Sequence, residues 1–251
     1  RTIAEMHFAM DQRKQLLMAN HRGVFWSLLG AVRTRQLVRA VQPLERLVVL
    51  TQADKEAWEK AGCRNVTVIP NPCAINSRKS KVESRKTKTV LAVGRLHEQK
   101  GFDLLLKAWA PIEKQLPDWT LRIVGEGPKH SELETQIQTL GLRHVVLAGR
   151  TENVAKEYAE ASLFVLSSRY EGLPLALIEA MWCGTGCVSF DCPQGPAELL
   201  ADKRGWLVEN GNVEKLTQQI EYALTHPDEV AARATEAQTY ARATYSEATI
   251  M

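Results

Sequence analysis

Residues 163–184 read LFVLSSRYEGLPLALIEAMWCG and contain one full unit of the fold. The apolar run Leu163–Leu166 has the length and composition of a buried strand in a parallel sheet. A polar loop follows it and ends at Pro174, a residue that suits the first turn of a helix. The apolar segment Pro174–Trp182 then predicts a helix. The stretch therefore predicts a strand, a loop and a helix, which is the repeating unit of an α/β fold.

The same unit recurs along most of the chain. Near the start, 12–40 is rich in predicted helix, and a strand at 47–50 leads to a helix that Thr51 or Asp54 can cap. A strand at 66–69 is closed by Pro70-Asn71-Pro72. Further strands are predicted at 89–93, 120–124, 145–147, 163–166, 186–190 and 205–208, and helices at 102–115, 131–140, 153–161, 174–182, 196–201, 212–225 and 226–245. This alternation predicts a parallel sheet covered by helices on both faces.

The composition excludes several classes of protein. Hydrophobic residues make up 45% and charged residues 24%, which rules out a disordered tail, a collagen-like fibre and a disulfide-rich mini-protein. No apolar run approaches the roughly 20 residues that a membrane-spanning helix needs. The net charge of +3 is too balanced to indicate nucleic-acid binding.

The cysteines indicate a reducing compartment. There are five of them, an odd number without paired spacing, so we expect a cytoplasmic protein with free thiols. Three lie close together at Cys183, Cys187 and Cys192, but they form no CxxC pair and have no histidine among them. We therefore expect no metal site there and interpret them as small buried apolar residues.

A change in composition marks a domain boundary. The segment Arg78–Lys88, RKSKVESRKTK, is basic and almost free of apolar residues, which is typical of a linker or exposed loop. We place the boundary just before it, near 73–76. The chain begins at Arg1 and stops at Met251 within a pattern, so we expect a fragment.

Ligands of parallel α/β sheets bind at the carboxyl ends of the strands, so the loops there are the candidate sites. In the loop 94–101, GRLHEQKG, Gly94 allows a sharp turn, and Arg95 and Lys100 flank a helix start. Two cations and free helix amides suit a diphosphate, although two solvated charges beside a turn are the alternative. Glycine turns at 125–128 and 148–150 fall on the same edge.

The loop 167–175 carries the second group of candidates. Gly172 allows close approach of the backbone, and the amides around Leu173 and Leu175 point beyond the strand end. Glu171 lies in this loop, and Glu179 lies inside the apolar helix, where a carboxylate is costly to bury unless it is paired or ligand-bound. One carboxylate could hold the vicinal hydroxyls of a ribose and the other those of a sugar. A buried ion pair with Lys or Arg is the alternative for Glu179.

Together these motifs resemble the family 4 glycosyltransferases, also described as glycosyl transferases group 1, which are retaining enzymes of the GT-B fold with two Rossmann-like domains. The match includes the spacing of Glu171 and Glu179 and runs from about Leu47 to Val208. A segment at 189–200, SFDCPQGPAELL, resembles a subset active on bacterial surface glycans. The other matching pieces are VIPNP (68–72), VGRLHEQKG (93–101), IVGEGP (123–128), LAGR (147–150) and SSRYEGLPLALIEAMWCG (167–184).

The resemblance implies a role for each matched residue. Arg95 and Lys100, with Gly94 at the turn, would neutralise the diphosphate of a nucleotide-sugar, and Glu179 would bind its ribose. Glu171 and the amides of the segment Gly172, Leu173, Pro174 and Leu175 would hold the donor sugar and phosphate, and Gly149 and Arg150 would contact the base. Family members need no metal or other cofactor for this step. The favoured nucleotide is UDP.

The resemblance also implies a domain plan. Residues 1–75 would be the later part of an N-terminal, acceptor-side Rossmann-like domain whose beginning is missing. Residues 76–240 would be the donor domain, and 241–251 the start of the C-terminal crossover helix. His7 would be the strand-end histidine that lies beneath the donor sugar, with an ordinary surface or capping histidine as the alternative.

Several functions remain open at this point. The resemblance implies transfer of a sugar to a surface-glycan or lipid-linked acceptor. A sucrose- or trehalose-type synthase, a phosphorylase and a non-catalytic nucleotide-sugar-binding fragment are the alternatives. Basic residues of the linker and of 12–39 could contact the inner face of a membrane or simply be solvated. A Rossmann dehydrogenase is poorly supported, because no strand is followed by GxGxxG with an acidic residue about 20 positions later.

Overall fold

A computed structural model describes residues 3–5, 24–75 and 86–250, with the backbone alone for 3–5 and 24–31. The strands are β1 (Ile3–Glu5), β2 (Arg46–Val49), β3 (Val66–Val68), β4 (Thr87–Val93), β5 (Thr120–Val124), β6 (Val145–Leu147), β7 (Ala161–Leu166), β8 (Gly186–Asp191) and β9 (Trp206–Glu209). The helices are α2 (Val24–Val41), α3 (Gln52–Lys60), α4 (Phe102–Gln115), α5 (His130–Leu140), α6 (Val154–Glu160), α7 (Leu175–Trp182), α8 (Pro196–Leu200), α9 (Val213–Thr225), α10 (Pro227–Thr244) and α11 (Glu247–Ile250), with a 3-10 turn η1 (Glu98–Lys100).

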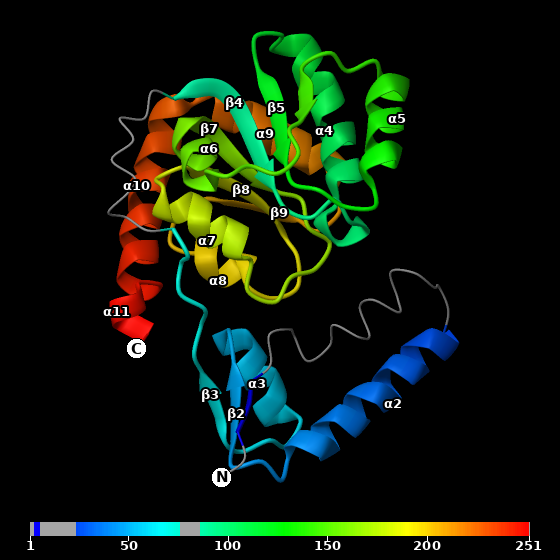
Figure 1. The fold of residues 1–251 in the computed structure, drawn as a ribbon, viewed down its shortest axis with the longest axis vertical. Helices are drawn as coiled ribbons and strands as arrows, with labels where there is room; N and C mark the ends of the chain where they lie inside the picture. The colour runs from blue at the N-terminus through cyan, green and yellow to red at the C-terminus, as the bar shows by residue number, and fades with distance from the viewer. Residues whose placement is uncertain (1–2, 6–23, 76–85, 251) are drawn as a thin grey trace.

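The described strands form two parallel sheets (Figure 1). The smaller has the order β1-β2-β3 and the larger the order β6-β5-β4-β7-β8-β9. In the larger sheet the chain moves outward from β4 to β6, returns to lie beside β4, and then moves outward again from β7 to β9. The strand order therefore reverses between β4 and β7, which is the position where open α/β sheets bind ligands. The predicted α/β class of the GT-B type is confirmed.

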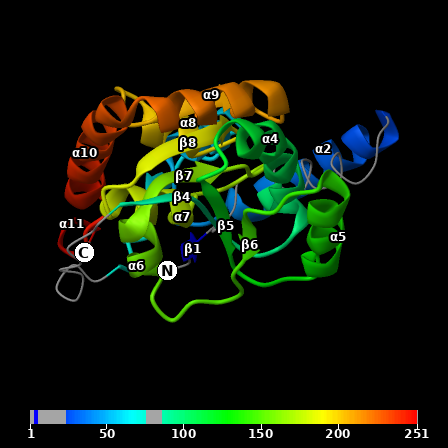
Figure 2. The same ribbon diagram turned by 90° about the horizontal axis from the view of Figure 1, so that it is seen from above.

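Alternating side chains of the larger sheet build two apolar layers, with helices on both faces (Figure 2). In β4, Val90 and Ala92 pack toward α4 and α9, whereas Leu91 packs toward α6, α7 and α10. All three side chains are fully buried. Burial on both faces explains why the strands are apolar without interruption, and each large buried side chain contributes about 1.5–3 kcal/mol.

The smaller sheet has a core of its own. Val49 of β2 and Trp58 of α3 are fully buried there. Of the two predicted caps, Thr51 begins α3, since its hydroxyl oxygen accepts a hydrogen bond from the backbone N–H of Asp54 at 3.1 Å. After β3 the chain reaches the larger core, where the Cys73 N–H donates to the carbonyl of Tyr245 at 2.9 Å. The end of α10 is thus attached to the segment that follows the smaller sheet.

Candidate functional site

Two loops meet at the point where the strand order reverses. They follow β4 (94–101) and β7 (167–174). The Ser167 hydroxyl donates to the carbonyl of Lys100 at 2.8 Å, and the Arg169 N–H donates to the carbonyl of Gln99 at 2.8 Å. The Gln99 side chain in turn donates to the carbonyl of Tyr170 at 3.0 Å. These bonds join two loops that are about 70 residues apart in sequence, so their side chains have fixed relative positions.

The two loops can approach so closely because of a glycine and an ion pair. Gly101 has φ +61°, and a Cβ there would clash with the carbonyl oxygen of Ser167. The Arg169 guanidinium binds the Asp103 carboxylate with two bonds, of 2.8 and 2.7 Å. Burial opposes the charged form of Asp103, but the hydrogen bonds and charge of Arg169 outweigh it and lower the pKa of this carboxyl. Arg169 thus braces the loop after β7 against the start of α4.

Lys100 and Glu171 form an ion pair at the centre of this joint. The Lys100 Nζ lies 2.7 Å from Glu171 Oε1, which also accepts from the Ser168 hydroxyl at 2.6 Å. The side chain of Glu171 is 6% exposed and that of Lys100 is 20% exposed. A Cβ at Gly94 would lie 3.2 Å from Lys100 Cδ, so the aliphatic part of the lysine crosses the turn after β4. An ammonium has three donors, and the described residues accept from one of them, which leaves two for a ligand.

The start of α7 supplies backbone donors beside this pair. The amides of Leu177 and Ile178 both donate to the carbonyl of Pro174, at 2.9 and 3.2 Å. Within the part of the chain that the structure describes, the amides of Leu173 and Leu175 have no acceptor. Free N–H groups at the positive end of a helix bind anions, so the predicted loop amides are available to a phosphate.

Glu179 lies one turn into α7 and is mostly buried. The hydroxyl of Tyr158, a residue of α6, donates to its Oε2 at 2.9 Å. No lysine or arginine among the described residues pairs with this carboxylate, so the alternative of a buried ion pair is not supported there. Burial raises the pKa of Glu179, and the hydrogen bond from Tyr158 partly offsets the rise. The other oxygen, Oε1, has no partner in the described ranges and can accept hydroxyl donors.

Two arginines line a hollow of about 420 Å³ at the carboxyl ends of β4, β5 and β6. Arg95 and Arg150, both exposed, lie there with Gly94, Gly125 and Thr151. The strand-end turns are bonded to each other, since the Gly125 N–H donates to the carbonyl of Gly149 at 2.7 Å. Arg95, Gly149 and Arg150 therefore lie on one edge, as predicted. Arg95 points into this hollow, whereas Lys100 points at Glu171.

The loop after β8 completes the edge. The Pro193 carbonyl accepts from the Glu171 N–H at 3.4 Å, and the side chain of Gln194 donates to Asp54 Oδ1 of α3 at 3.3 Å. Gln194 has φ +64°, a backbone conformation that non-glycine residues rarely adopt. The segment 189–200, which the resemblance links to surface glycans, thus touches both the Glu171 loop and the helix α3 beside the smaller sheet.

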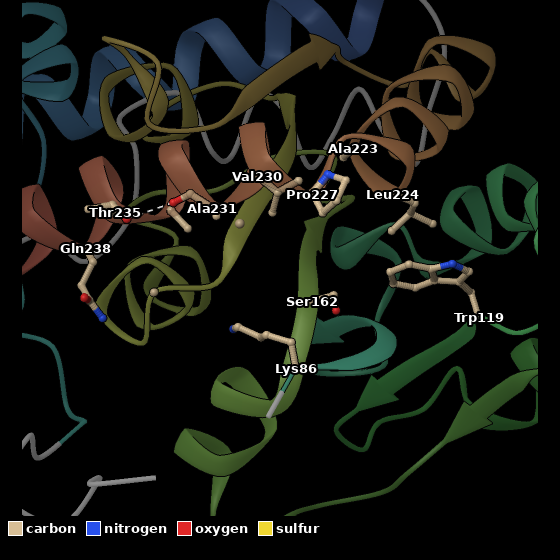
Figure 3. Close-up of a pocket in the computed structure, with 13 residues that line it drawn as sticks. Lys86, Trp119, Ser162, Ala223, Leu224, Pro227, Val230, Ala231, Thr235 and Gln238 are labelled. Carbon is tan, nitrogen blue, oxygen red and sulfur yellow. Dashed lines mark hydrogen bonds between the residues drawn. The ribbon is translucent and has the colours of Figure 1, made fainter. Parts of the chain in front are cut away.

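A larger cavity lies at the opposite edge of the same sheet (Figure 3). Its volume is about 540 Å³, and it opens beside the amino ends of β4, β7 and β8. Its walls are mostly apolar, and Lys86, the one charged residue among the described residues that line it, donates to the carbonyl of Ala161 at 2.9 Å. The predicted site residues that the structure describes lie elsewhere, and strand polarity places ligands at the other edge. We therefore assign the candidate site to the carboxyl edge, where Lys100, Glu171 and Glu179 lie, although its hollow is smaller.

The sequence missed three residues of this edge. Tyr158, Ser168 and Arg169 contact the predicted carboxylates or brace their loop, yet nothing in their local sequence marks them. His7 lies outside the described residues. The five cysteines are free, and the described ranges contain no group of three His, Cys, Asp or Glu side chains arranged for a metal. Those ranges also contain no helix with the length and apolarity to cross a membrane.

Comparison with known proteins shows the family of the chain. Residues 75–242 match the sequence profile of the family described as "Glycosyl transferases group 1". The chain belongs to this family. It is 37% identical to an uncharacterized glycosyltransferase of Haemophilus influenzae over 78% of the chain and 56% of that protein. It is also 37% identical to the amylovoran biosynthesis glycosyltransferase AmsD of Erwinia amylovora, over 70% of the chain and 51% of that protein.

A solved structure shows the same architecture. A variant of TarM from S. aureus, in complex with fondaparinux, alpha-GlcNAc-glycerol and UDP, superposes with a TM-score of 0.79 at 25% identity, covering 87% of this group 1 chain and 45% of TarM. The chain thus spans about half the length of the relatives it matches.

Proposed function

We propose that this group 1 chain binds a nucleotide-sugar, most simply a UDP-sugar, as the donor-binding part of a hexosyltransferase that retains the anomeric configuration. The observation that carries the proposal is the joint between the loops after β4 and β7. It places a lysine with unused donors, unbonded helix amides and a carboxylate at the reversal of strand order. TarM, 25% identical to the chain, was solved with UDP, which supports the choice of nucleotide.

Each part of a nucleotide-sugar has a matching group on this edge. Lys100, Arg95 and the amides at the start of α7 would hold the diphosphate, without a metal. Glu171 would contact the donor sugar, and Glu179 Oε1 the ribose hydroxyls. The backbone at Gly149 and the side chain of Arg150 would contact the base. When the bond from the sugar to the diphosphate breaks, the leaving group takes the electron pair, and these preorganised donors would stabilise its charge.

The relatives support a proposal for the acceptor. One relative, 33% identical over 72% of the chain, is a Campylobacter jejuni N-acetylgalactosaminyltransferase whose named substrate is an undecaprenol-linked glycan. We propose a surface-glycan or lipid-linked acceptor, used in the cytoplasm at the inner face of the membrane. Residues 1–75 would belong to the acceptor-side domain, with His7 beneath the donor sugar, 76–240 to the donor domain, and 241–251 to a crossover helix.

Titration calorimetry of the chain with UDP and with GDP, in EDTA, tests the proposal. We expect UDP to bind, and Glu179→Gln to weaken UDP by about tenfold, since a hydrogen bond to a charged group is worth about 1.5–3 kcal/mol. Glu229→Gln is a matched control, because Glu229 also accepts a hydrogen bond from a tyrosine, Tyr222, but at an exposed position between α9 and α10. If neither nucleotide binds, or if both variants bind UDP like the unmodified chain, the donor-site assignment is wrong.

A further inference from the structure

We propose that Tyr158 is a positioning residue that holds Glu179 as a charged, correctly turned acceptor for the ribose of the nucleotide. The inference rests on the proposed function, since it takes Glu179 as the ribose-binding carboxylate. Its basis is one contact, the 2.9 Å hydrogen bond from the Tyr158 hydroxyl to Glu179 Oε2. This bond occupies one carboxylate oxygen from the protein side and leaves Oε1 to the ligand.

A tyrosine suits this task better than a cation. A lysine or arginine would neutralise Glu179 and could occupy both of its oxygens, as Arg122 does with Glu157 at 2.7 and 2.9 Å. The phenol donates a single bond and keeps the negative charge on the carboxylate, which strengthens the bonds that it accepts from neutral hydroxyls. The Arg122–Glu157 pair and the Tyr158–Glu179 pair lie in neighbouring parts of the same domain. Basic residues are therefore present in this region, and a general shortage of them does not explain why Glu179 is bonded to a tyrosine.

Tyr158 is fixed well enough to impose a direction on its partner. Its side chain is completely buried, and its ring meets Phe164 of β7 edge-on, with centroids 5.6 Å apart and the planes at 65°. Its backbone carbonyl accepts from the Thr185 hydroxyl at 2.6 Å. The ring is thus held by β7 and the backbone by the loop before β8, both independently of Glu179. A mobile donor could not fix the rotation of a carboxylate, whereas a residue held at these two points can.

The surroundings of the pair make its hydrogen bond important. The groups that face it are the thiols of Cys73 and Cys183, with Cys187 beside the tyrosine. Burial raises the pKa of Cys73 to about 11 and that of Cys183 to about 12, so both thiols are neutral near pH 7. No cation in the described ranges offsets the charge of Glu179, and within those ranges the Tyr158 hydroxyl is the one donor that its side chain accepts from. Removal of that hydroxyl therefore removes the main protein interaction that favours the carboxylate.

The test compares UDP with 2'-deoxy-UDP and 3'-deoxy-UDP by calorimetry at pH 7. In the unmodified chain we expect the analogue that lacks the bound hydroxyl to bind about tenfold more weakly than UDP. In Tyr158→Phe we expect the affinity for UDP itself to fall. We also expect the ratio of the affinity for UDP to that for this analogue to fall to about twofold, since the carboxylate no longer has a fixed direction. Phenylalanine preserves the ring contact with Phe164, and a thermal melt confirms folding. Thr185→Val, which removes only the backbone anchor, should lower the ratio in the same direction by a smaller factor.

Matched controls separate a positioning role from a structural one. Tyr222→Phe removes the same kind of tyrosine–glutamate bond from Tyr222 to Glu229, 2.7 Å long and on the surface, and should leave the ratio unchanged. If Tyr158→Phe lowers thermal stability and weakens UDP and its deoxy analogues equally, Tyr158 only supports the fold and the inference is wrong. If Glu179→Gln abolishes the discrimination but Tyr158→Phe and Thr185→Val keep it, the inference fails and the proposed function stands. If Glu179→Gln itself changes nothing, it is the proposed function that fails.

Discussion

The two edges of the larger sheet differ in the volume of their cavities and in the polar groups that they offer a ligand, and the larger volume is not at the edge with more such groups. The amino edge has the larger cavity, about 540 Å³, with mostly apolar walls and a lysine that is bonded to a backbone carbonyl. The carboxyl edge has a hollow of about 420 Å³ and, next to it, loops that hold Lys100, Glu171 and unbonded helix amides. Volume alone would favour the amino edge. The proposed site at the carboxyl edge rests instead on its unused donors and acceptors.

The difference follows from strand direction. In a parallel sheet every connection from strand to helix leaves at the carboxyl edge, so the amino ends of the following helices point there with free N–H groups. At the other edge the chain returns from the carboxyl ends of helices to the next strands, and side chains such as those of α10 line the larger cavity there (Figure 3). The helix N-termini that directly follow strands therefore gather at the carboxyl edge, which favours anionic ligands there. Substitutions at the two edges should differ accordingly in their effect on nucleotide binding.

The largest expected effect is that of Lys100→Met, which keeps the aliphatic stem across Gly94 but removes the ammonium. UDP affinity should fall by roughly tenfold to a hundredfold, because a charge-assisted bond to phosphate is lost. Glu171 would remain buried with only Ser168 as a side-chain donor, so the free energy of unfolding should fall by about 3 kcal/mol. Calorimetry and urea denaturation measure the two effects.

A lysine far from the edge gives the control for this substitution. Lys88 pairs with Asp118 at 2.9 Å, but the two side chains are 61% and 75% exposed. Lys88→Met should change stability by less than about 1 kcal/mol and leave UDP binding intact. Equal UDP affinity in Lys100→Met and the unmodified chain would show that the carboxyl edge does not hold the diphosphate.

Acidification should weaken UDP binding through Glu179. Burial raises the pKa of this carboxyl, and its charged form is the one that accepts ribose hydroxyls, so affinity should fall as the pH drops through the raised pKa. Stability should respond in the opposite sense, because the native state holds this proton more tightly than the unfolded chain does. The contribution of Glu179 to the free energy of unfolding is therefore full below its pKa in the unfolded chain, and it is lost as the pH rises through its pKa in the folded chain. Calorimetry between pH 5 and 8 on the unmodified chain and Glu179→Gln measures the first effect. A variant with the same pH dependence as the parent would assign the titration to another group.

The sequence predicted the elements of the larger sheet to within about two residues and placed Lys100, Glu171, Glu179 and Arg150 on one edge. This was possible because strand polarity and glycine turns are local features. The partners of these residues were not predictable. Asp103 and Arg169 are 66 positions apart, and Tyr158 and Glu179 are 21 apart, so only the order of the strands brings them together. Local sequence could not distinguish an ion pair from a tyrosine bond at Glu179 for the same reason.

A smaller effect is expected from Asp103→Asn, which removes the charge of the brace that joins the two loops. The pair is partly exposed, so the free energy of unfolding should fall by only about 1–2 kcal/mol. UDP affinity should fall by about threefold, because Arg169 would no longer fix the loop that carries Glu171. Asp118→Asn is the exposed control for stability and should affect neither quantity. An unchanged unfolding transition in Asp103→Asn would show that the backbone bonds between the loops suffice.

The smallest effect is expected at the amino edge, and it completes the comparison. Ala231 of α10 is exposed and lines the larger cavity, so Ala231→Phe can fill much of that space without disturbing the core. The connections from strand to helix begin at the other edge, so the variant should bind UDP with an affinity within about twofold of the parent. A twofold change in affinity corresponds to less than about 0.5 kcal/mol of binding free energy. A melt would show whether the phenyl ring packs, since added apolar contact raises stability and an exposed ring leaves it unchanged. Loss of UDP binding in Ala231→Phe with an intact fold would mean that the nucleotide uses the amino edge, or that the two edges are coupled through β4 and β7, and either result would overturn the assignment by strand polarity.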